Sequence, residues 1–375
     1  MKVSVIIPSL NEAETIGICI ERVKTIFDRY NINGEIIVAD NSDDDTPQIA
    51  RSLGAKVIIP NKRGYGYAYL YAFKHANGEI LVMGDADGTY DFSEMPRLLE
   101  PIIKGEADMV IGSRFKGKIE RGAMPWLHKH IGNPLLTHFL NIFFKASVSD
   151  ANSGFRAIRR DALEKLDLRS HGMEFASEMI IKALLAKLKI REVPITYSPR
   201  RAGRSKLNSL SDGWRHLKFM LFYAPSYLYT YPGLILSIFG LLLMSLGYFE
   251  VYFGYTPGLH SIILGSFCFL IGLQLLFLSL FAGVYEIGMG LPVSDRLMQP
   301  LLEHLTLEKG AIIGTTLFLT GFIYLIGLLV RWVGSGFVVL PLRGEDIVAF
   351  SLLTSGLQIF FNSFLLSAMI ETRKT

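Results

Sequence analysis

The stretch ILVMGDADGTYDF, residues 80–92, decides how the first half of the chain folds. An apolar run leads into Asp85 and Asp87, which are separated only by Ala86, and Asp91 follows four residues later. A short apolar run that ends in polar residues is typical of a buried strand meeting a polar edge of its sheet. Carboxylates crowded at such an edge repel one another and lose solvation. We therefore expect a positive group at the end of this strand.

The segments around this stretch alternate between short apolar runs and amphipathic runs with helical spacing. We expect strands at residues 3–8, 35–40, 56–60, 79–85 and 107–113, and helices at about 11–30, 46–53, 66–76 and 93–103. Alternation at this spacing predicts an open, Rossmann-like and mostly parallel α/β sheet. In such sheets ligands bind at the carboxyl ends of the strands.

The polar clusters of the sequence fall at those ends. The first strand runs into PSLNEAE, the second into DNSDDDT and the later one into DADGTYD. Several carboxylates at one edge suit a metal ion together with a ribose or base. No G-x-G-x-x-G follows the first strand, the Gly-rich NKRGYGYAY lacks the third glycine, and there is no P-loop motif. A dinucleotide-binding domain and a P-loop NTPase are therefore excluded.

The second half of the chain is much more apolar than the first. Half of the 375 residues are hydrophobic, and charges nearly vanish for long stretches after Tyr231. Four segments are long enough to cross a bilayer, at about 232–253, 260–284, 310–332 and 347–370. We expect a catalytic domain at 1–208, amphipathic interface helices at 209–231 and a four-helix transmembrane domain at 232–375.

Basic residues just before the first span predict the orientation. They are Arg200, Arg201, Arg204, Lys206, Arg215, His216 and Lys218. Such a cluster beside a span usually faces the anionic cytoplasmic headgroups. The segment that follows Ser209 reads as a helix on the membrane surface, or as an ordinary packed helix. The first apolar run is too short for a signal peptide, so we expect a multi-pass cell-membrane protein with a cytoplasmic catalytic domain.

The net charge and the cysteine content exclude two further kinds of site. The formal net charge of +4 is modest, so we expect no nucleic-acid partner. Cys19 and Cys268 are the only cysteines, which leaves no disulfide framework or cysteine metal site.

Seven motifs, taken in order, resemble one known family. They are SVIIPSLNEAETI, VADNSDDDT, NKRGYGYA, GDADG, IGSRF, SGFR and EVPITYSPRRAGRSKL. Together they are similar to the family 2 glycosyltransferases, and specifically to the polyprenyl-phosphate glycosyl synthases that make dolichyl-phosphate mannose or glucose. The resemblance covers residues 1 to about 208, and the four-span tail is also similar to that of some members.

The resemblance implies the chemistry of the paired aspartates. It implies a glycosyltransferase type A fold that binds a UDP- or GDP-hexose through Mg²⁺ or Mn²⁺ and inverts the anomeric carbon. Asp85 and Asp87 match the D-x-D motif whose carboxylates hold the metal, with Ala86 beside the nucleotide-sugar and Asp87 also catalytic. Hard oxygen ligands suit these ions. Thr89 stands where a glutamine often lies in the family, which leaves the third metal ligand open.

Other positions match the nucleotide-sugar contacts of the family. They are Asp40 at the end of the second strand, Pro8, Asn11 and Glu12 in the first loop, and Lys62 and Gly64 in the glycine-rich loop. Asn11 and Glu12 could equally be a helix N-cap and the acid of its first turn.

The acceptor that the resemblance implies is a polyprenyl or dolichyl phosphate. Its oxygen is already anionic at neutral pH, so it needs positive charge and alignment more than a strong general base. Arg114 and Arg200 match arginines near the phosphates of the family and are candidate catalytic residues, with Ser205 and Lys206 close to Arg200. Where the family has an arginine-rich segment this chain has WLHKHIGN, in which Lys129 or His128 stands in for the arginine. Headgroup attraction is the alternative role for the basic residues near Arg200.

Two other functions remain open. A processive polysaccharide synthase would share the D-x-D but carries Q-x-x-R-W, whereas here Leu328 precedes Arg331 and Trp332. A non-catalytic membrane scaffold that binds nucleotide is the second. The choice between mannose and glucose, the lipid length and the oligomeric state all stay open.

Overall fold

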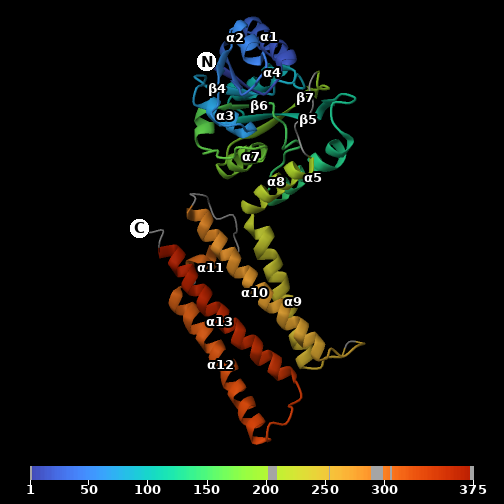
Figure 1. Cartoon of the computed structure of the whole chain (residues 1–375), viewed down its shortest axis with the longest axis vertical. Coiled ribbons are helices and arrows are strands. Elements are labelled where there is room, and N and C mark those ends of the chain that lie inside the picture. Colours follow the sequence, from blue (N-terminus) through green and yellow to red (C-terminus); the bar gives the residue numbers. More distant parts are fainter. Residues whose placement is uncertain (1, 202–208, 253, 289–298, 305, 372–375) are drawn as a thin grey trace. The chain divides into compact units, whose positions relative to one another are not determined.

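The computed structural model describes residues 2–201, 209–252, 254–288, 299–304 and 306–371. The chain forms two compact units, Met1–Phe222 and Tyr223–Thr375 (Figure 1). Each unit is described by itself.

The first unit is a seven-stranded sheet covered by helices. Its strands are β1 (Lys2–Ser9), β2 (Asn33–Asp40), β3 (Lys56–Ile58), β4 (Ile80–Met83), β5 (Met109–Ile119), β6 (Arg156–Arg159) and β7 (Ile190–Tyr197). Its helices are α1 (Ala13–Arg29), α2 (Thr46–Ser52), α3 (Tyr65–Phe73), α4 (Met95–Ile103), α5 (Asn133–Phe144), α6 (Arg160–Glu164), α7 (Phe175–Leu185) and α8 (Ser209–Phe222), with shorter turns η1 (Phe92–Glu94) and η2 (His128–Gly132).

The sheet is mixed and mostly parallel, with strand order β3-β2-β1-β4-β6-β5-β7. All neighbours pair in parallel except β6, which is antiparallel to both β4 and β5. The expected α/β sheet is confirmed, and the five predicted strands correspond to β1 to β5. The carboxyl ends of β1, β2 and β4 meet at one edge, so the sequences that follow them lie together.

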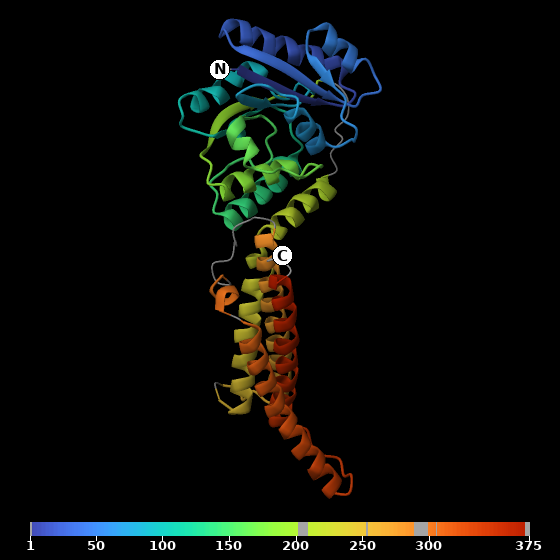
Figure 2. The same cartoon turned by 90° about the vertical axis from the view of Figure 1, so that its left-hand side faces the viewer.

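Apolar residues fill both faces of this sheet. On one face, alternate residues of β1, β2 and β4 pack against α1 and α4 around Ile20 and Leu98. The other face carries α3 and α7, which contribute the buried Tyr69 and Phe175, stacked at 5.4 Å. Figure 2 shows α1 running along the outer side of the sheet. The edge that carries the polar clusters is thus built on strands buried from both sides.

The predicted interface segment is divided between the two units: α8 belongs to the first, where it packs against α5 and α7, and the residues from Tyr223 onward belong to the second. His216 on α8 is buried, and its Nδ1 lies 2.8 Å from the hydroxyl of Ser177 on α7. The expectation that His216 faces lipid headgroups is therefore wrong, because this ring is turned into the protein. Trp214 and Phe222 of the same helix are exposed, so α8 is a packed helix that also presents apolar side chains.

The second unit consists of long apolar helices. They are η3 (Ser226–Thr230) with α9 (Tyr231–Tyr248), α10 (Leu259–Gly288), α11 (Gln299–His304), α12 (Leu307–Gly334) and α13 (Gly344–Glu371). Four stretches among the described residues are long and apolar enough to cross a membrane: Ser226–Tyr248, Leu259–Ile287, Leu307–Gly334 and Gly344–Glu371. They coincide with the four predicted spans, although the first helix ends at Tyr248 rather than 253.

Glycines set the helix packing in this second unit. A Cβ on Gly240 of α9 would lie 2.5 Å from the carbonyl oxygen of Gly265 on α10, and Gly314 of α12 meets Gly356 of α13 in the same way at 2.7 Å. Only residues without a side chain allow the backbones to come this close. The second unit therefore contains two closely packed antiparallel hairpins, α9 with α10 and α12 with α13 (Figure 1).

Candidate active site

The paired aspartates follow β4 directly. Asp87 Oδ1 accepts hydrogen bonds from the backbone nitrogen of Thr89 at 3.0 Å and from its hydroxyl at 2.6 Å. Gly88, at a φ of 74°, closes this turn in a conformation that side chains disfavour. Because the turn is tied to its own aspartate, Asp87 is held at the carboxyl end of β4.

Asp85 lies deeper, where its negative charge is poorly solvated. Burial, followed by the charge of Asp87, raises the pKa of Asp85 to about 7, against a hydrogen bond from Tyr65 and the charges of Arg114 and Arg200. Near neutral pH this carboxyl group is therefore poised between its protonated and ionised forms. A cation bound beside both aspartates would hold Asp85 ionised, which fits the positive group expected from the sequence.

The donor set fits a divalent cation that is shared with a ligand. Two aspartates supply hard oxygen atoms of the kind that Mg²⁺ and Mn²⁺ prefer. The residues described in the structure contain no group of three or more His, Cys, Asp or Glu side chains that could enclose a metal. The hydroxyl of Thr89, expected as a possible third ligand, is engaged with Asp87. A metal held here would keep coordination positions for oxygens that come from outside the chain.

Asp91, the third acid of the opening stretch, has a structural role. Its Oδ1 accepts a hydrogen bond from the backbone nitrogen of Ser93 at 3.0 Å, which caps η1. It also forms an ion pair with Arg22 of α1 at 3.2 Å. The opening stretch thus contains two acids of the site and one acid that anchors a helix.

An ion pair between Glu12 and Arg200 joins the loop after β1 to the segment that follows β7. Arg200 Nη2 lies 2.5 Å from Glu12 Oε1 and 3.5 Å from Asp87 Oδ2. The Glu12 backbone nitrogen donates to the hydroxyl of Thr46 at 2.9 Å, which fixes the loop that carries it. The structure therefore places Arg200 beside Asp87 and Glu12.

The capping interpretation of Asn11 is wrong. Helix α1 begins at Ala13 with Glu12 at the N-cap position, and the Glu12 side chain makes no capping hydrogen bond, whereas Asp44 Oδ2 accepts one from the backbone nitrogen of Ala13 at 3.4 Å. Asn11 has a φ of 55°, and its Oδ1 accepts a hydrogen bond from the backbone nitrogen of Asp43 at 2.9 Å. Its own backbone nitrogen donates to the hydroxyl of Ser42 at 2.6 Å. Asn11 therefore joins the loops after β1 and β2 instead of starting the helix.

Asp40 ends β2 beside the end of β1. Its Oδ1 accepts a hydrogen bond from the hydroxyl of Ser9 at 2.6 Å, and its Oδ2 accepts one from the backbone nitrogen of Ser42 at 3.1 Å. Pro8 is half-buried opposite Ala39 in the parallel register. Asp40 is buried, so these hydrogen bonds hold it at the edge where the loops meet.

The glycine-rich loop leads into α3. Lys62 is exposed, and Arg63 pairs with Asp43 at 3.0 Å. Gly64 has a φ of 155°, and a Cβ there would lie 2.6 Å from the carbonyl oxygen of His171. Only glycine fits this position, which sets the direction in which α3 begins.

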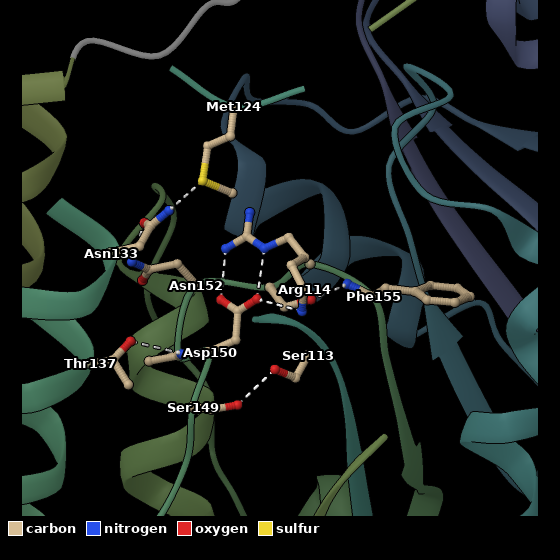
Figure 3. Close-up of polar contacts among 12 residues, drawn as sticks. Ser113, Arg114, Met124, Asn133, Thr137, Ser149, Asp150, Asn152 and Phe155 are labelled. Carbon is tan, nitrogen blue, oxygen red and sulfur yellow. Dashed lines mark hydrogen bonds and ion pairs between the residues drawn. The ribbon is translucent and has the colours of Figure 1, made fainter. Parts of the chain in front are cut away.

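Arg114 lies on β5 and is clamped by Asp150 (Figure 3). Its Nε lies 2.7 Å from Asp150 Oδ2 and its Nη2 lies 2.7 Å from Oδ1, while its backbone nitrogen donates to Oδ2 at 3.0 Å. Both side chains are almost fully buried. Nη1 makes no hydrogen bond within the described part of the chain, and the guanidinium lies 5.1 Å from the ring of Tyr197. One guanidinium nitrogen of Arg114, Nη1, therefore takes no part in the ion pair with Asp150.

The remaining predicted residues are less well defined. Lys129 lies on η2, half-buried, and its backbone nitrogen bonds the carbonyl oxygen of Pro125 at 3.0 Å. Ser205 and Lys206 lie outside the described residues. Ala86 is buried between the two aspartates.

Sequence reasoning missed four residues that shape the site. They are Tyr65, Asp150, Gly154 and Arg156, which contact Asp85 or Arg114 or hold the backbone next to them. Tyr65, Gly154 and Arg156 lie within the quoted motifs NKRGYGYA and SGFR. A motif identifies the segment, but it does not indicate which residues its side chains contact.

The mixed sheet, the aspartate pair at the end of β4 and the four apolar helices together define a membrane glycosyltransferase with the A-type fold. The chain belongs to glycosyltransferase family 2. Residues 4–167 match the family model described as "Glycosyl transferase family 2". Residues 280–370 match the model described as "Glycosyltransferase family 2 C-terminal transmembrane region".

Several known proteins are similar to it. The low-salt glycan biosynthesis hexosyltransferase Agl6 of Haloferax volcanii is 48% identical over 98% of this chain and 89% of its own length. The dolichol-phosphate mannosyltransferase of Pyrococcus furiosus is 33% identical over 58% of this chain and 63% of its length. Among solved structures, glucosyl-3-phosphoglycerate synthase from Mycobacterium tuberculosis is 24% identical with a TM-score of 0.49, over 60% of this chain and 80% of that one.

Proposed function

We propose that this glycosyltransferase moves a single hexose from a UDP- or GDP-hexose to a polyprenyl or dolichyl phosphate. The transfer takes place at the cytoplasmic face of the membrane and inverts the anomeric carbon. Relatives named as a hexosyltransferase of glycan biosynthesis and as dolichyl-phosphate sugar transferases support this substrate class.

The proposal depends on the hydrogen bonds and ion pairs that the acids at this edge make with other residues. Each is already engaged with a named partner: Asp85 with Tyr65, Asp87 with Thr89 and Arg200, Glu12 with Arg200, Asp40 with Ser9 and Ser42, and Asp150 with Arg114. A sugar hydroxyl acceptor would need one of these acids as a general base. A lipid phosphate is already ionised and needs arginines, so the arrangement favours the phosphate.

The chain's own residues then have distinct roles. Arg200 and Nη1 of Arg114 attract the acceptor phosphate and align its oxygen, with Lys129, Ser205 and Lys206 as further contacts. The oxygen forms the new bond at the anomeric carbon while the bond to the nucleoside diphosphate breaks on the opposite side, which inverts that carbon. Alignment and charge complementarity supply the rate enhancement.

The nucleotide-sugar lies across the loops after β1, β2 and β4. Pro8, Asn11, Glu12 and Asp40 contact the nucleoside end, Lys62 and Gly64 border the nucleotide, and Ala86 lies next to the sugar. Asp85 and Asp87 hold Mg²⁺ or Mn²⁺, and Thr89 orients Asp87. A divalent ion supplies charge neutralisation for the departing diphosphate.

The proposed cytoplasmic orientation rests on charge. Arg215 and Lys218 are exposed on α8, next in sequence to the first apolar helix. Basic residues at this position favour the cytoplasmic side.

The test uses the purified full chain in detergent. It is incubated with a panel of UDP- and GDP-hexoses, Mn²⁺ and a short-chain polyprenyl phosphate, and the lipid products are weighed by mass spectrometry. We expect the lipid to gain one hexose and no more. The anomeric coupling constant of the product, measured by NMR, should report inversion.

Matched variants separate the site from its surroundings. Asp87→Asn should abolish transfer, whereas Asp91→Asn, which alters the acid that caps η1, should leave it largely intact. Addition of many hexoses would favour a processive synthase. Nucleotide binding without any transfer would favour a non-catalytic scaffold, and either result would contradict the proposal.

A further inference from the structure

We propose that Tyr65 is a positioning residue for Asp85, and that α7 supports both walls around this carboxylate through Glu178 and Arg156. The inference deepens the proposed function, because it takes Asp85 as one of the two groups that hold the divalent cation.

Asp85 lies beside a hydroxyl and a glycine. The Tyr65 hydroxyl donates to Asp85 Oδ1 at 3.1 Å. Next to this hydroxyl, a Cβ on Gly154 would lie 3.0 Å from Asp85 Oδ2 and 2.8 Å from the Tyr65 hydroxyl oxygen. The backbone nitrogen of Gly154 is held by a hydrogen bond of 2.8 Å to the hydroxyl of Tyr90. The hydroxyl and the glycine backbone thus lie together against the carboxylate, which limits its rotation toward other orientations.

The wall that contains Tyr65 depends on the start of α3. Tyr65 is the first residue of that helix. A Cβ on Gly66 would lie 2.3 Å from the carbonyl oxygen of Ser170, and the backbone nitrogen of Tyr67 donates to the carbonyl oxygen of His171 at 3.1 Å. The first turn of α3 is therefore packed directly against the backbone of residues 170–171.

Glu178 of α7 holds that backbone in place. Its carboxylate accepts hydrogen bonds from the backbone nitrogen of Arg169 at 2.9 and 3.1 Å and from that of Ser170 at 2.8 Å. Lys182, one turn further along α7, pairs with it at 2.9 Å. Glu178 is 1% exposed, so the acid serves the protein interior and not a ligand. A path of contacts therefore leads from Glu178 through residue 170 to Tyr65.

Arg156 supports the wall that contains Gly154 in a similar manner. It is 1% exposed and donates to three carbonyl oxygens, those of Ser153 at 2.7 Å, Ala151 at 2.8 Å and Ala176 at 2.8 Å. Ala176 belongs to α7, whereas the other two residues lie in the segment that precedes Gly154. Arg156 thereby ties this segment to the same helix that carries Glu178.

Both contacts act on the geometry of a metal ligand. Groups that hydrogen-bond a ligating carboxylate fix its orientation before the metal arrives, and their loss typically lowers metal affinity or activity by about 10- to 100-fold. Tyr65 has this position relative to Asp85, while Glu178 and Arg156 act at a distance. We therefore expect loss of the Tyr65 hydroxyl to weaken metal binding, and to lower turnover mainly where the metal is not saturating.

The experiment measures binding of Mn²⁺ alone to the full chain in detergent, by the loss of the free-Mn²⁺ EPR signal. Tyr65→Phe keeps the ring and removes only the hydroxyl, and we expect the dissociation constant for Mn²⁺ to rise by about tenfold or more. Tyr71→Phe is the matched control, because Tyr71 lies on the same helix and its hydroxyl bonds no residue that the structure describes. It should leave the dissociation constant unchanged.

Activity and thermal unfolding complete the test. With Tyr65→Phe, the Mn²⁺ concentration for half-maximal transfer should rise, while kcat at saturating Mn²⁺ stays within about threefold of the wild type. Gly154→Ala should weaken Mn²⁺ binding in the same direction.

Several results would overturn the assignment. An unchanged Mn²⁺ affinity in Tyr65→Phe would do so, as would a loss that only follows an equal loss of thermal stability. A wild-type chain that binds no Mn²⁺ would overturn it as well. A wild-type chain that binds Mn²⁺ but transfers no hexose would contradict the proposed function instead, and the comparison of Tyr65→Phe with Tyr71→Phe would still decide the role of Tyr65.

Discussion

Arg200 and Glu12, 188 residues apart in the sequence, form an ion pair in which Nη2 lies 2.5 Å from Oε1. The same nitrogen lies 3.5 Å from Oδ2 of Asp87. One guanidinium thus faces the first loop and the aspartate pair at once. A phosphate that approached this edge would meet Arg200 next to the carboxylates proposed to hold the cation, which is where negative charge gathers during the proposed transfer.

Removal of Arg200 should therefore affect turnover strongly. We expect Arg200→Ala to lower kcat by about 100-fold or more, since removing one preorganised donor to a developing charge has effects of that size. Arg200→Lys should recover part of the activity, because lysine keeps the charge but lacks the planar fork. Initial rates at saturating nucleotide-sugar provide the measurement.

Lys104→Ala is the control for removal of one positive charge. Lys104 is exposed and pairs with Glu100 at the surface, so its loss should leave kcat unchanged. Wild-type turnover in Arg200→Ala would show that this arginine does not act on the acceptor.

Stabilisation of the protein by Mn²⁺ should depend on pH through Asp85. Burial and the neighbouring Asp87 raise the pKa of Asp85 to about 7 from 3.8. Because the folded state holds this proton more tightly than the unfolded state, the metal-free protein loses stability as the pH rises toward 7. Mn²⁺ binds the ionised form, so its stabilising effect grows over the same range. Melting temperatures with and without Mn²⁺, at about pH 5.5 and about pH 8, should show the larger increase at the higher pH.

Asp85→Asn isolates this effect. The amide cannot ionise, so the metal-free variant should melt several degrees above the metal-free wild type at about pH 8, while transfer is lost. An equal effect of Mn²⁺ on the wild type at both pH values would show that Asp85 is not the group that titrates.

Local sequence patterns predict much of the fold. The apolar run at residues 80–83 and the acids that follow it identify β4 and its polar end, because both signals lie within a few residues of each other. The four spans follow from length and hydropathy alone. Strand β6 escaped prediction because its four residues gain their partners from β4 and β5, far away in the sequence. An antiparallel strand inserted into a parallel sheet leaves no distinct local pattern.

The site could be predicted only in part, for a similar reason. The motifs identify Asp85, Asp87 and Arg200, but nothing in the sequence indicates which of many acids pairs with Arg114, 36 residues from Asp150. The role of Asp91 was accessible, because an acid followed at short range by Ser93 and Glu94 is a common helix-start signal.

The Arg114 and Asp150 pair makes a separate prediction about stability. Asp150→Ala leaves a buried guanidinium without its partner, which costs about 3–5 kcal/mol in comparable sites. We expect a large fall in melting temperature, measured by intrinsic fluorescence. A double variant, Arg114→Met with Asp150→Leu, removes both charges and should recover part of that loss, because the backbone nitrogen of residue 114 still loses its acceptor.

The same double variant tests the catalytic role of Arg114. If Nη1 of this arginine aligns the acceptor phosphate, the recovered protein should fold but transfer hexose poorly. A double variant that is both stable and fully active would restrict Arg114 to a structural role.

The packing of the second unit supports a prediction that compares two glycines. A Cβ on Gly240 would lie 2.4 Å from the backbone nitrogen of Phe269 and 2.5 Å from the carbonyl oxygen of Gly265, so Gly240→Ala must push α9 and α10 apart.

On Gly327 of α12 a Cβ would meet nothing within 4 Å. Gly327→Ala should therefore keep or slightly raise the melting temperature, because alanine favours the helix by about 0.5–1 kcal/mol over glycine. Gly240→Ala should lower it, since lost interhelical contact outweighs that gain. Equal shifts in the two variants would mean that close approach of α9 and α10 contributes nothing to stability.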